Sequence, residues 1–141
     1  MRTVLDTNVL ISTLLVRDSV TRRAFEAAFA NGQVLLSFEL LAELDGVLGR
    51  KQFRKYVDET DVWRFVAALL RESEWVHVVT SITVCRDPKD NGILALAVDG
   101  HATCIVTGDN DLLCLNPFRG TRIETPAQFL GRLPPPSPNR K

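Results

Sequence analysis

The sequence predicts an α/β fold in three layers, with helices on both faces of a central, mainly parallel sheet of four to five strands. One observation behind this prediction is that short apolar runs alternate along the chain with longer segments of helical periodicity. A second is that the short runs are apolar on both faces, which is typical of strands covered on two sides. The third is size, because 141 residues, 45% of them hydrophobic, fit one domain with a substantial core.

Five short segments are predicted to be strands because they are apolar or rich in β-branched residues. They are residues 3–5, 34–36, 75–79, 104–106 and 122–124, of which the last is the weakest candidate. Right-handed connections between parallel strands then give an open, doubly wound sheet.

The segments between these strands have helical patterns. They are residues 8–16, 20–30, 38–50, 59–72 and 89–99, followed by a short helix that ends at Leu130. Thr125 before Pro126 is typical of an N-cap with proline at the first helical position. We expect one domain over residues 1–131 and a disordered Pro-rich tail over 132–141, because clustered prolines can form neither a ladder nor a continuous helix.

Composition excludes several classes of protein. Seventeen basic residues balance seventeen acidic ones, so net charge does not indicate a nucleic-acid partner. No apolar run approaches the roughly 20 residues of a membrane span, and Asp6 interrupts the first apolar stretch, so no secretory signal is expected. The three cysteines contain no CxxC pair and predict neither a disulfide framework nor a zinc site. We therefore expect a cytoplasmic domain.

Acidic side chains follow two predicted strands at the point where each strand ends. Asp6 comes directly after the first strand, and Asp109 and Asp111 follow the fourth. Because ligands bind beyond the carboxyl ends of strands in open parallel sheets, these acids are expected to meet at one edge. Turn formation is the alternative explanation for Asp109 and Asp111, and helix capping is the alternative for Asp6.

Asp90 is expected to be buried. On a helical wheel it aligns with Ile93, Leu94 and Ala97, so its carboxylate begins the apolar stripe of its helix. An unpaired charge there would be unfavourable, and a metal ion or a hydrogen-bonded cluster would offset that cost. The alternative is that Asp90 only completes a helix start for which Asp87 is the predicted N-cap.

Two further acids, Glu43 and Asp45, flank the apolar stripe of the helix after the second strand, and periodicity does not choose between them. Oxygen ligands of this kind suit Mg²⁺ or Mn²⁺. Such ions activate water and stabilise the leaving oxygen in phosphodiester hydrolysis. His77 and His101 are not expected to be catalytic, because no Ser/His/Asp set is visible.

Four motifs, taken in order, resemble the PIN-domain family. They are LDTNVL at 5–10, Glu43 within a leucine-rich helix, DPKDN at 87–91 and VTGDNDL at 106–112. More narrowly, the chain resembles stand-alone bacterial PIN proteins of the VapC type, which are toxins of toxin–antitoxin pairs, from about residue 2 to about residue 130. The resemblance implies a three-layer PIN-like fold and an Mg²⁺- or Mn²⁺-dependent endoribonuclease that hydrolyses RNA.

The resemblance also implies roles for individual residues. It gives the catalytic acids as Asp6, Glu43, Asp90 and Asp109. It gives the metal ligands as Asp6, Asp90 and Asp109, together with Asp111 and, through water, Glu43. Asn8 and Thr107 match polar positions that orient these acids. Gly92 departs from the family, whose members more often carry a bulkier residue there.

The sequence also predicts surfaces for RNA and for partner proteins. Arg50, Lys51, Arg54 and Lys55 recur at spacings that put them on one helical face, which could contact RNA phosphates or be simply solvated. Apolar residues within 9–29 exceed what a small sheet face covers, which predicts a homodimer interface. The resemblance implies the same dimer and an antitoxin whose Arg or Lys faces the acids. The alternative function is a non-catalytic PIN scaffold that binds RNA or protein.

Overall fold

The computed structural model describes residues 1–134, and the greater part of the predicted tail, residues 135–141, lies outside the described residues. The strands form one sheet in the order β3-β2-β1-β4-β5, and every pairing is parallel. Their bounds are β1 Arg2–Leu5, β2 Gln33–Leu36, β3 Glu74–Trp75, β4 Cys104–Val106 and β5 Arg122–Glu124. The predicted α/β fold with a central parallel sheet is therefore confirmed.

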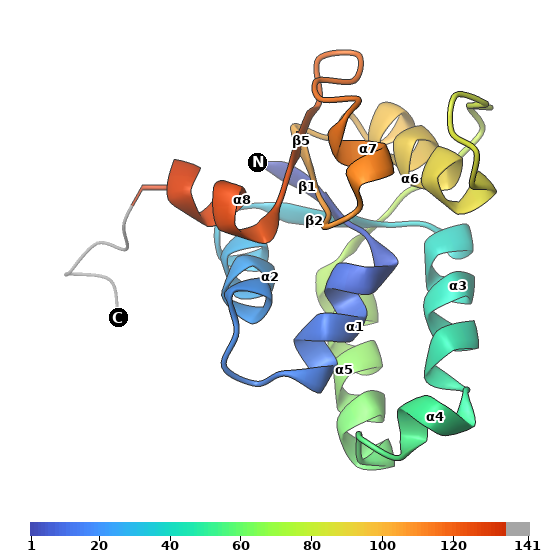
Figure 1. Cartoon of the computed structure of the whole chain (residues 1–141), viewed down its shortest axis with the longest axis vertical. Helices are drawn as coiled ribbons and strands as arrows, with labels where there is room; N and C mark the ends of the chain where they lie inside the picture. The colour runs from blue at the N-terminus through green and yellow to red at the C-terminus, as the bar shows by residue number, and fades with distance from the viewer. Residues whose placement is uncertain (135–141) are drawn as a thin grey trace.

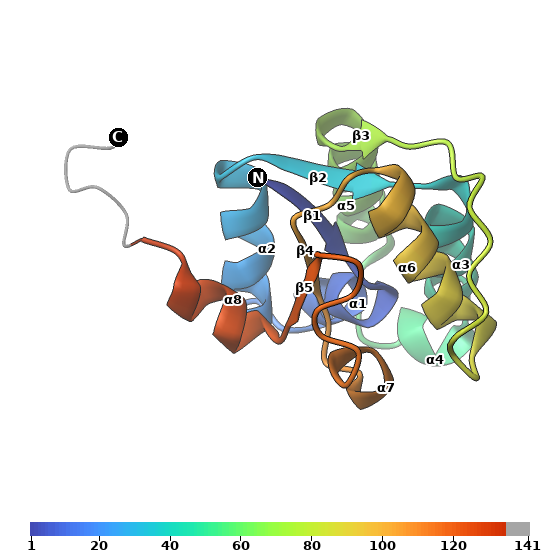
Figure 2. The same ribbon diagram turned by 90° about the horizontal axis from the view of Figure 1, so that it is seen from above.

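The helices pack on both faces of the sheet. Their bounds are α1 Thr7–Leu15, α2 Val20–Ala30, α3 Phe38–Leu48, α4 Lys51–Arg54, α5 Glu59–Glu72, α6 Pro88–Asp99, α7 Asn110–Leu113 and α8 Pro126–Arg132. Helices α1, α2 and α5 lie on one side of the sheet, whereas α6 and α7 lie on the other (Figure 1, Figure 2). The last helix runs one residue past the predicted domain boundary, to Arg132.

Polar residues set where most helices begin. Ser19, Ser37 and Asp58 each accept a hydrogen bond from a backbone N–H of the first turn of α2, α3 and α5. Thr125 and Gln128 form a reciprocal capping box at the start of α8. These caps are readable in the sequence, which explains why most helix starts are predicted to within a residue or two.

The third strand exists, but it covers only Glu74–Trp75, so the predicted extent over 75–79 is wrong. Val76 donates the last bond of the ladder to the carbonyl of Leu36, at 2.8 Å. The backbone N–H groups of Val79 and Thr80 instead donate to Asp99 Oδ2, at 2.7 and 2.8 Å. Because a side chain of α6 satisfies these donors, the chain leaves the sheet edge, and Val79 is 75% exposed.

The expected helix over 38–50 is also too long. Helix α3 ends at Leu48, Gly49 is its C-cap, and a separate short helix, α4, follows. The basic residues Arg50, Lys51, Arg54 and Lys55 follow this junction. A second short helix that the sequence did not predict, α7, begins directly after Asp109.

The core takes up much of the apolar surface of α1 and α2. Val9, Leu10, Ala24 and Ala28 are buried, while Leu15, Val16 and Val20 remain exposed at the connection between the two helices. The apolar surface left for an interface within residues 9–29 is therefore smaller than expected. Within residues 1–134, no helix is long and apolar enough to span a bilayer.

Candidate active site

The strand order places a functional site between β1 and β4. Strands β1, β2 and β3 follow one another toward one edge, and the chain then crosses back to β4 on the other side of β1. Clefts that bind ligands form at such switch points, outside the carboxyl ends of the strands. A cleft of about 210 Å³ lies there. Its acidic and polar lining comprises Asp6, Thr7, Asn8, Glu43, Asp87, Asp90 and Asp109.

Asp6 comes directly after β1 and is a buried residue, at 6% exposure. One oxygen accepts a hydrogen bond from the backbone N–H of Val9 at 2.9 Å, and the other accepts from the hydroxyl of Thr107. Burial raises the pKa of Asp6, and the charges of Asp109 and Glu43 add to the rise, against the two hydrogen bonds that lower it. Asp6 therefore caps α1 and also carries a charge into the cleft.

Thr107, the residue after β4, links the two strand ends. Its hydroxyl donates to Asp6 and accepts from the backbone N–H of Asp109, at 3.0 Å for the second bond. The side chain is fully buried, so its rotamer is fixed by the surrounding core. Thr107 thus links the carboxylate of Asp6 to the backbone of Asp109.

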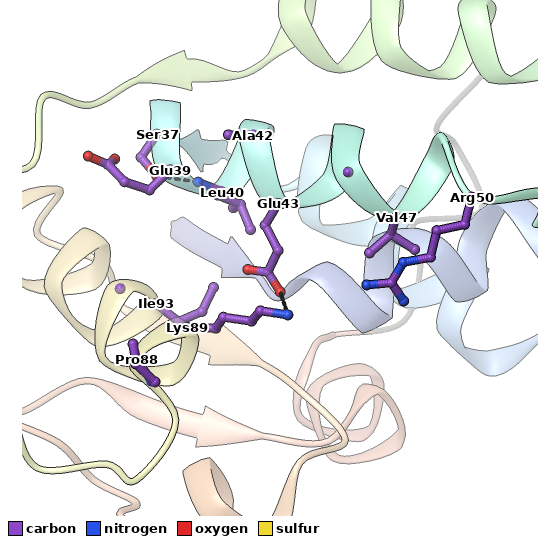
Figure 3. A pocket seen from close by; sticks show the side chains of 12 residues that line it. Ser37, Glu39, Leu40, Ala42, Glu43, Val47, Arg50, Pro88, Lys89 and Ile93 are labelled. Carbon is purple, nitrogen blue, oxygen red and sulfur yellow. Dashed lines mark hydrogen bonds and ion pairs between the residues drawn. The ribbon is translucent and has the colours of Figure 1, made fainter.

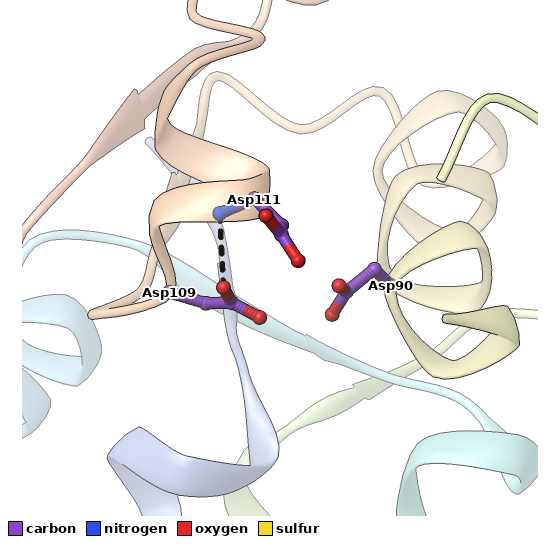
Figure 4. A group of neighbouring side chains, drawn as sticks. All are labelled: Asp90, Asp109 and Asp111. Carbon is purple, nitrogen blue, oxygen red and sulfur yellow. Dashed lines mark hydrogen bonds between the residues drawn. The ribbon is translucent and has the colours of Figure 1, made fainter. Parts of the chain in front are cut away.

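Three aspartates form a tight group on the α6–α7 side of the cleft (Figure 4). Asp90, Asp109 and Asp111 each offer one oxygen, and these oxygens lie within 4.8 Å of one another. Asp90 projects from the first turn of α6, while Asp109 caps α7 and accepts the backbone N–H of Asp111 at 2.9 Å. Asp109 therefore caps the turn while its carboxylate also lies in the acidic group, so turn formation does not exclude a role in the site.

Asp90 is the acid most affected by its neighbours. It is 8% exposed, as the helical wheel predicts. Burial raises the pKa of Asp90 to about 6, and the charges of Asp109, Asp87 and Asp111 contribute in the same direction. The carboxylates of the cluster therefore repel one another, and a bound cation would reduce this repulsion.

Within the described residues, the ion pairs at this site involve Glu43 and Asp111. Lys89 Nζ lies 3.9 Å from Glu43 Oε1 (Figure 3), and an Arg86 nitrogen lies 3.7 Å from Asp111 Oδ1. Both cations are largely exposed, so these pairs contribute little to stability. Sequence reasoning assigned no role to Arg86 or Lys89, although both stand beside the acids of the DPKDN motif.

The donors in the cleft fit a hard divalent cation. Carboxylates dominate the polar lining, and among the described residues neither histidine nor cysteine lines this cleft. The hydroxyl of Thr7 is buried at the same place and has no hydrogen-bond partner in the described part of the chain. Oxygen-only sets of this kind are typical of Mg²⁺ and Mn²⁺ sites and unsuited to zinc or copper. Asp6 and Glu43 line the cleft without belonging to the tight aspartate group.

The remaining candidates separate clearly in space. Asn8 is exposed and lines the cleft, and Asp87 caps α6 by accepting the backbone N–H of Lys89 at 3.0 Å. Glu43 faces the cleft, whereas Asp45 lines a different groove, between α3 and α5. The structure thus decides between two acids that periodicity left open.

The predicted basic face does not form as one surface. Arg50 lies in the connection before α4 and lines the acidic cleft, whereas Arg54 lines the groove beside Trp63. Lys51 and Lys55 are exposed. Lys51 and Arg54 lie within the four-residue helix α4, and Arg50 and Lys55 are its N-cap and C-cap, so these residues surround one short helix that does not continue α3.

Residues 2–111 match the PIN domain family. An uncharacterized protein of Methanocaldococcus jannaschii, MJ1680, is 30% identical over 117 residues, which covers 82% of this chain and 75% of the relative. A similar solved structure is that of VapBC2 from Rickettsia felis bound to a DNA fragment from their promoter. It aligns with a TM-score of 0.61 and 16% identity over 89% of this chain and 98% of that chain, which shows a shared fold.

Proposed function

The chain belongs to the PIN domain family, whose members are generally nucleases, and we propose that it is a metal-dependent endoribonuclease and the toxin of a toxin–antitoxin pair. One observation carries the proposal: Asp6, Asp90 and Asp109 enter a single cleft at the switch point of the sheet, and within the described residues none of the three forms an ion pair with the basic side chains nearby. Structural carboxylates rarely share a buried site in this way. The proposed substrate is RNA, and the proposed place of action is the cytoplasm.

The acids would hold Mg²⁺ or Mn²⁺. Asp90, Asp109 and Asp111 offer converging oxygens, and Asp6 and Glu43, which line the same cleft, would act directly or through water. A bound ion of this type lowers the pKa of water and stabilises the leaving oxygen of a phosphodiester. Substrate phosphate oxygens and water commonly complete such a coordination shell.

Other residues of the cleft position the reacting groups. Val9 and Thr107 hold both oxygens of Asp6, so this carboxylate presents the same orientation to every substrate. Burial and the neighbouring carboxylates raise the pKa of Asp90 to about 6, and a cation bound to Asp90 would favour its charged form. Arg50 and Lys89 place positive charge at the rim of the cleft, where it can attract the phosphate backbone.

Purified protein and a single-stranded RNA test the proposal. Cleavage is expected with Mg²⁺ or Mn²⁺ and is expected to stop in excess chelator. Glu43→Gln should lower the rate by at least about tenfold, because it removes a charge from the cleft. Asp45→Asn is the matched control, since it alters the same helix outside the cleft. Equal cleavage in excess chelator would contradict the mechanism.

The toxin assignment adds two proposed partners. A small antitoxin would place Arg or Lys against Asp6, Glu43, Asp90 and Asp109 and compete with the metal ion. A likeness in fold to the VapBC2 structure supports this proposal. The affinity of such an inhibitor should fall with added Mg²⁺ and on neutralisation of Asp109, and indifference to both changes would contradict it.

A homodimer is the second proposed partner. The exposed Leu15, Val16 and Val20 are the part of residues 9–29 that remains available to an interface. Light scattering across a wide concentration range tests this proposal. A strictly monomeric 15.7 kDa species at high micromolar concentration would refute it.

A further inference from the structure

A second groove lies beside the acidic cleft, between α3 and α6 (Figure 3). It has a volume of about 550 Å³, which is within the range of small-molecule sites. Leu40 and Val47 of α3 form one wall, and Pro88 and Ile93 of α6 form the other. This space, called here the α3–α6 groove, is mostly apolar.

The α3–α6 groove is continuous with the acidic cleft on one side. Glu43, Val47, Arg50, Lys89 and Ile93 line both spaces. On the other side the groove continues past Gly92 into a third hollow of about 490 Å³, which is bordered by the hydroxyl side chains of Thr80, Ser81 and Thr83. One path therefore runs from the acids, through an apolar groove, to a hydroxyl-lined hollow.

Two glycines keep the middle of this path open. A Cβ atom at Gly46 of α3 or at Gly92 of α6 would meet no other atom within 4 Å, so packing requires glycine at neither position. Glycine inside a helix is less favourable than alanine. Gly92 borders both the α3–α6 groove and the hollow beyond it, so a large side chain there would close the passage.

We propose that the α3–α6 groove binds the nucleobase of the RNA nucleotide next to the scissile phosphate, an inference that rests on the proposed nuclease function. The apolar walls suit the two faces of a planar base. Arg50 and Lys89 stand where the groove joins the acidic cleft, which is where the phosphate of that nucleotide would lie. The hydroxyl groups of Ser81 and Thr83 beyond Gly92 suit the ribose of the following nucleotide. The Thr80 hydroxyl instead donates to Asp99. Gly92 is then a determinant of which bases fit.

A nucleotide explains these features better than an apolar peptide segment does. Arg50 and Lys89 at the junction match a phosphate that the ribose joins to the base, although Lys89 is also paired with Glu43 there. The opening into the acidic cleft would leave that phosphate beside the proposed metal ligands. An apolar peptide would use the walls of the groove and leave Arg50 without a partner of opposite charge on the ligand.

The test is a nuclear magnetic resonance titration of the full chain in Mg²⁺ with the four nucleoside 5′-monophosphates, which contain no phosphodiester bond to hydrolyse. At least one nucleotide should shift the amide signal of Gly46, and ribose 5-phosphate, which lacks the base, should not. Gly92→Leu should weaken nucleotide binding about tenfold, as expected when a side chain fills a pocket, and Gly92→Ala should weaken it less. Gly131→Leu, an open position on α8, is the matched control and should change nothing.

Equal shifts with ribose 5-phosphate, or unchanged nucleotide affinity in a folded Gly92→Leu protein, would overturn the proposal. A thermal melt of each variant shows whether it is folded. RNA cleavage by the wild-type chain is measured in parallel. Its absence would overturn the nuclease function, while the titration would still decide whether the groove binds a base.

Discussion

Two carboxylates at the same edge of the sheet are buried to nearly the same depth and have opposite surroundings. Glu124, the last residue of β5, is 8% exposed, and Asp6, directly after β1, is 6% exposed. Arg132 Nε donates to the two oxygens of Glu124 at 3.0 and 3.1 Å, and another nitrogen of the same guanidinium lies 2.8 Å from one of them. Asp6 receives hydrogen bonds only from neutral donors, Val9 and Thr107.

The difference separates a structural acid from a functional one. The charge of Glu124 is neutralised within the fold by Arg132. The hydrogen bond to Glu124 also raises the pKa of Arg132. Asp6, Asp90 and Asp109 instead repel one another across the cleft. Since that arrangement opposes folding, we interpret it as a site kept for a cation from outside the chain.

The largest expected effect is on activity, from exchanging each carboxylate for its amide. Asp6→Asn should lower RNA cleavage by about a thousandfold or more, because it removes a charged ligand from the cleft. Its folding should survive, since asparagine can still accept the backbone N–H of Val9 and is a good N-cap. Glu124→Gln should retain cleavage per folded molecule. A comparable loss of activity in both variants would show that Glu124 is not a purely structural acid.

The next effect is on stability. Arg132→Met should lower the free energy of unfolding by about 2 kcal/mol, because it leaves Glu124 charged and buried without a partner. Arg132 keeps part of its surface in solvent, so the loss should stay below that of a fully buried pair. Urea unfolding measures it. A loss under about 0.5 kcal/mol would show that the pair is not the stabilising feature described above.

A smaller effect is the pH dependence of stability in the metal-free protein. The pKa of Asp90 is about 6 in the folded chain and lower in the unfolded one, so the unfolded state releases its proton first. Asp90 therefore contributes stability below about pH 4, and that contribution is lost as the pH rises through 6. Asp90→Asn should remove this slope and melt a few degrees higher at pH 7 without metal. A steeper slope in the variant would contradict the assignment.

The smallest expected effect comes from an acid beside the cluster that acts as a cap. Asp87→Ala should destabilise the protein by about 1 kcal/mol, because the backbone N–H of Lys89 loses its acceptor. The loss should be the same with and without Mg²⁺, as thermal melts can establish. A metal-dependent change would move Asp87 from the structural acids to the functional ones.

Much of the fold was predictable from periodicity and caps, and its failures have local causes. The strands before Asp6 and Asp109 are apolar on both faces and were placed correctly, as was the buried position of Asp90. The third strand failed because Asp99, far away in the sequence, captures its backbone donors. Helices α4 and α7 have four residues each, which is too short to show a period.

The acids of the site were more predictable than what surrounds them. Strand ends and one helical wheel identify Asp6, Asp90 and Asp109. Periodicity alone did not choose between Glu43 and Asp45; the family resemblance indicated Glu43, and the position of α3 relative to α6 places Glu43 in the cleft and Asp45 outside it. The contacts of Lys89 and the open space at Gly92 depend on the same spacing between helices.

We propose that the unpaired acids, and not the paired one, bind a divalent cation. Calorimetric titration with Mn²⁺ of wild-type protein, Asp109→Asn and Glu124→Gln distinguishes the two kinds of acid. We expect saturable binding to the wild type, at least about tenfold weaker binding to Asp109→Asn, and wild-type affinity for folded Glu124→Gln. Binding that survives Asp109→Asn unchanged, or that is lost in folded Glu124→Gln, would contradict this proposal.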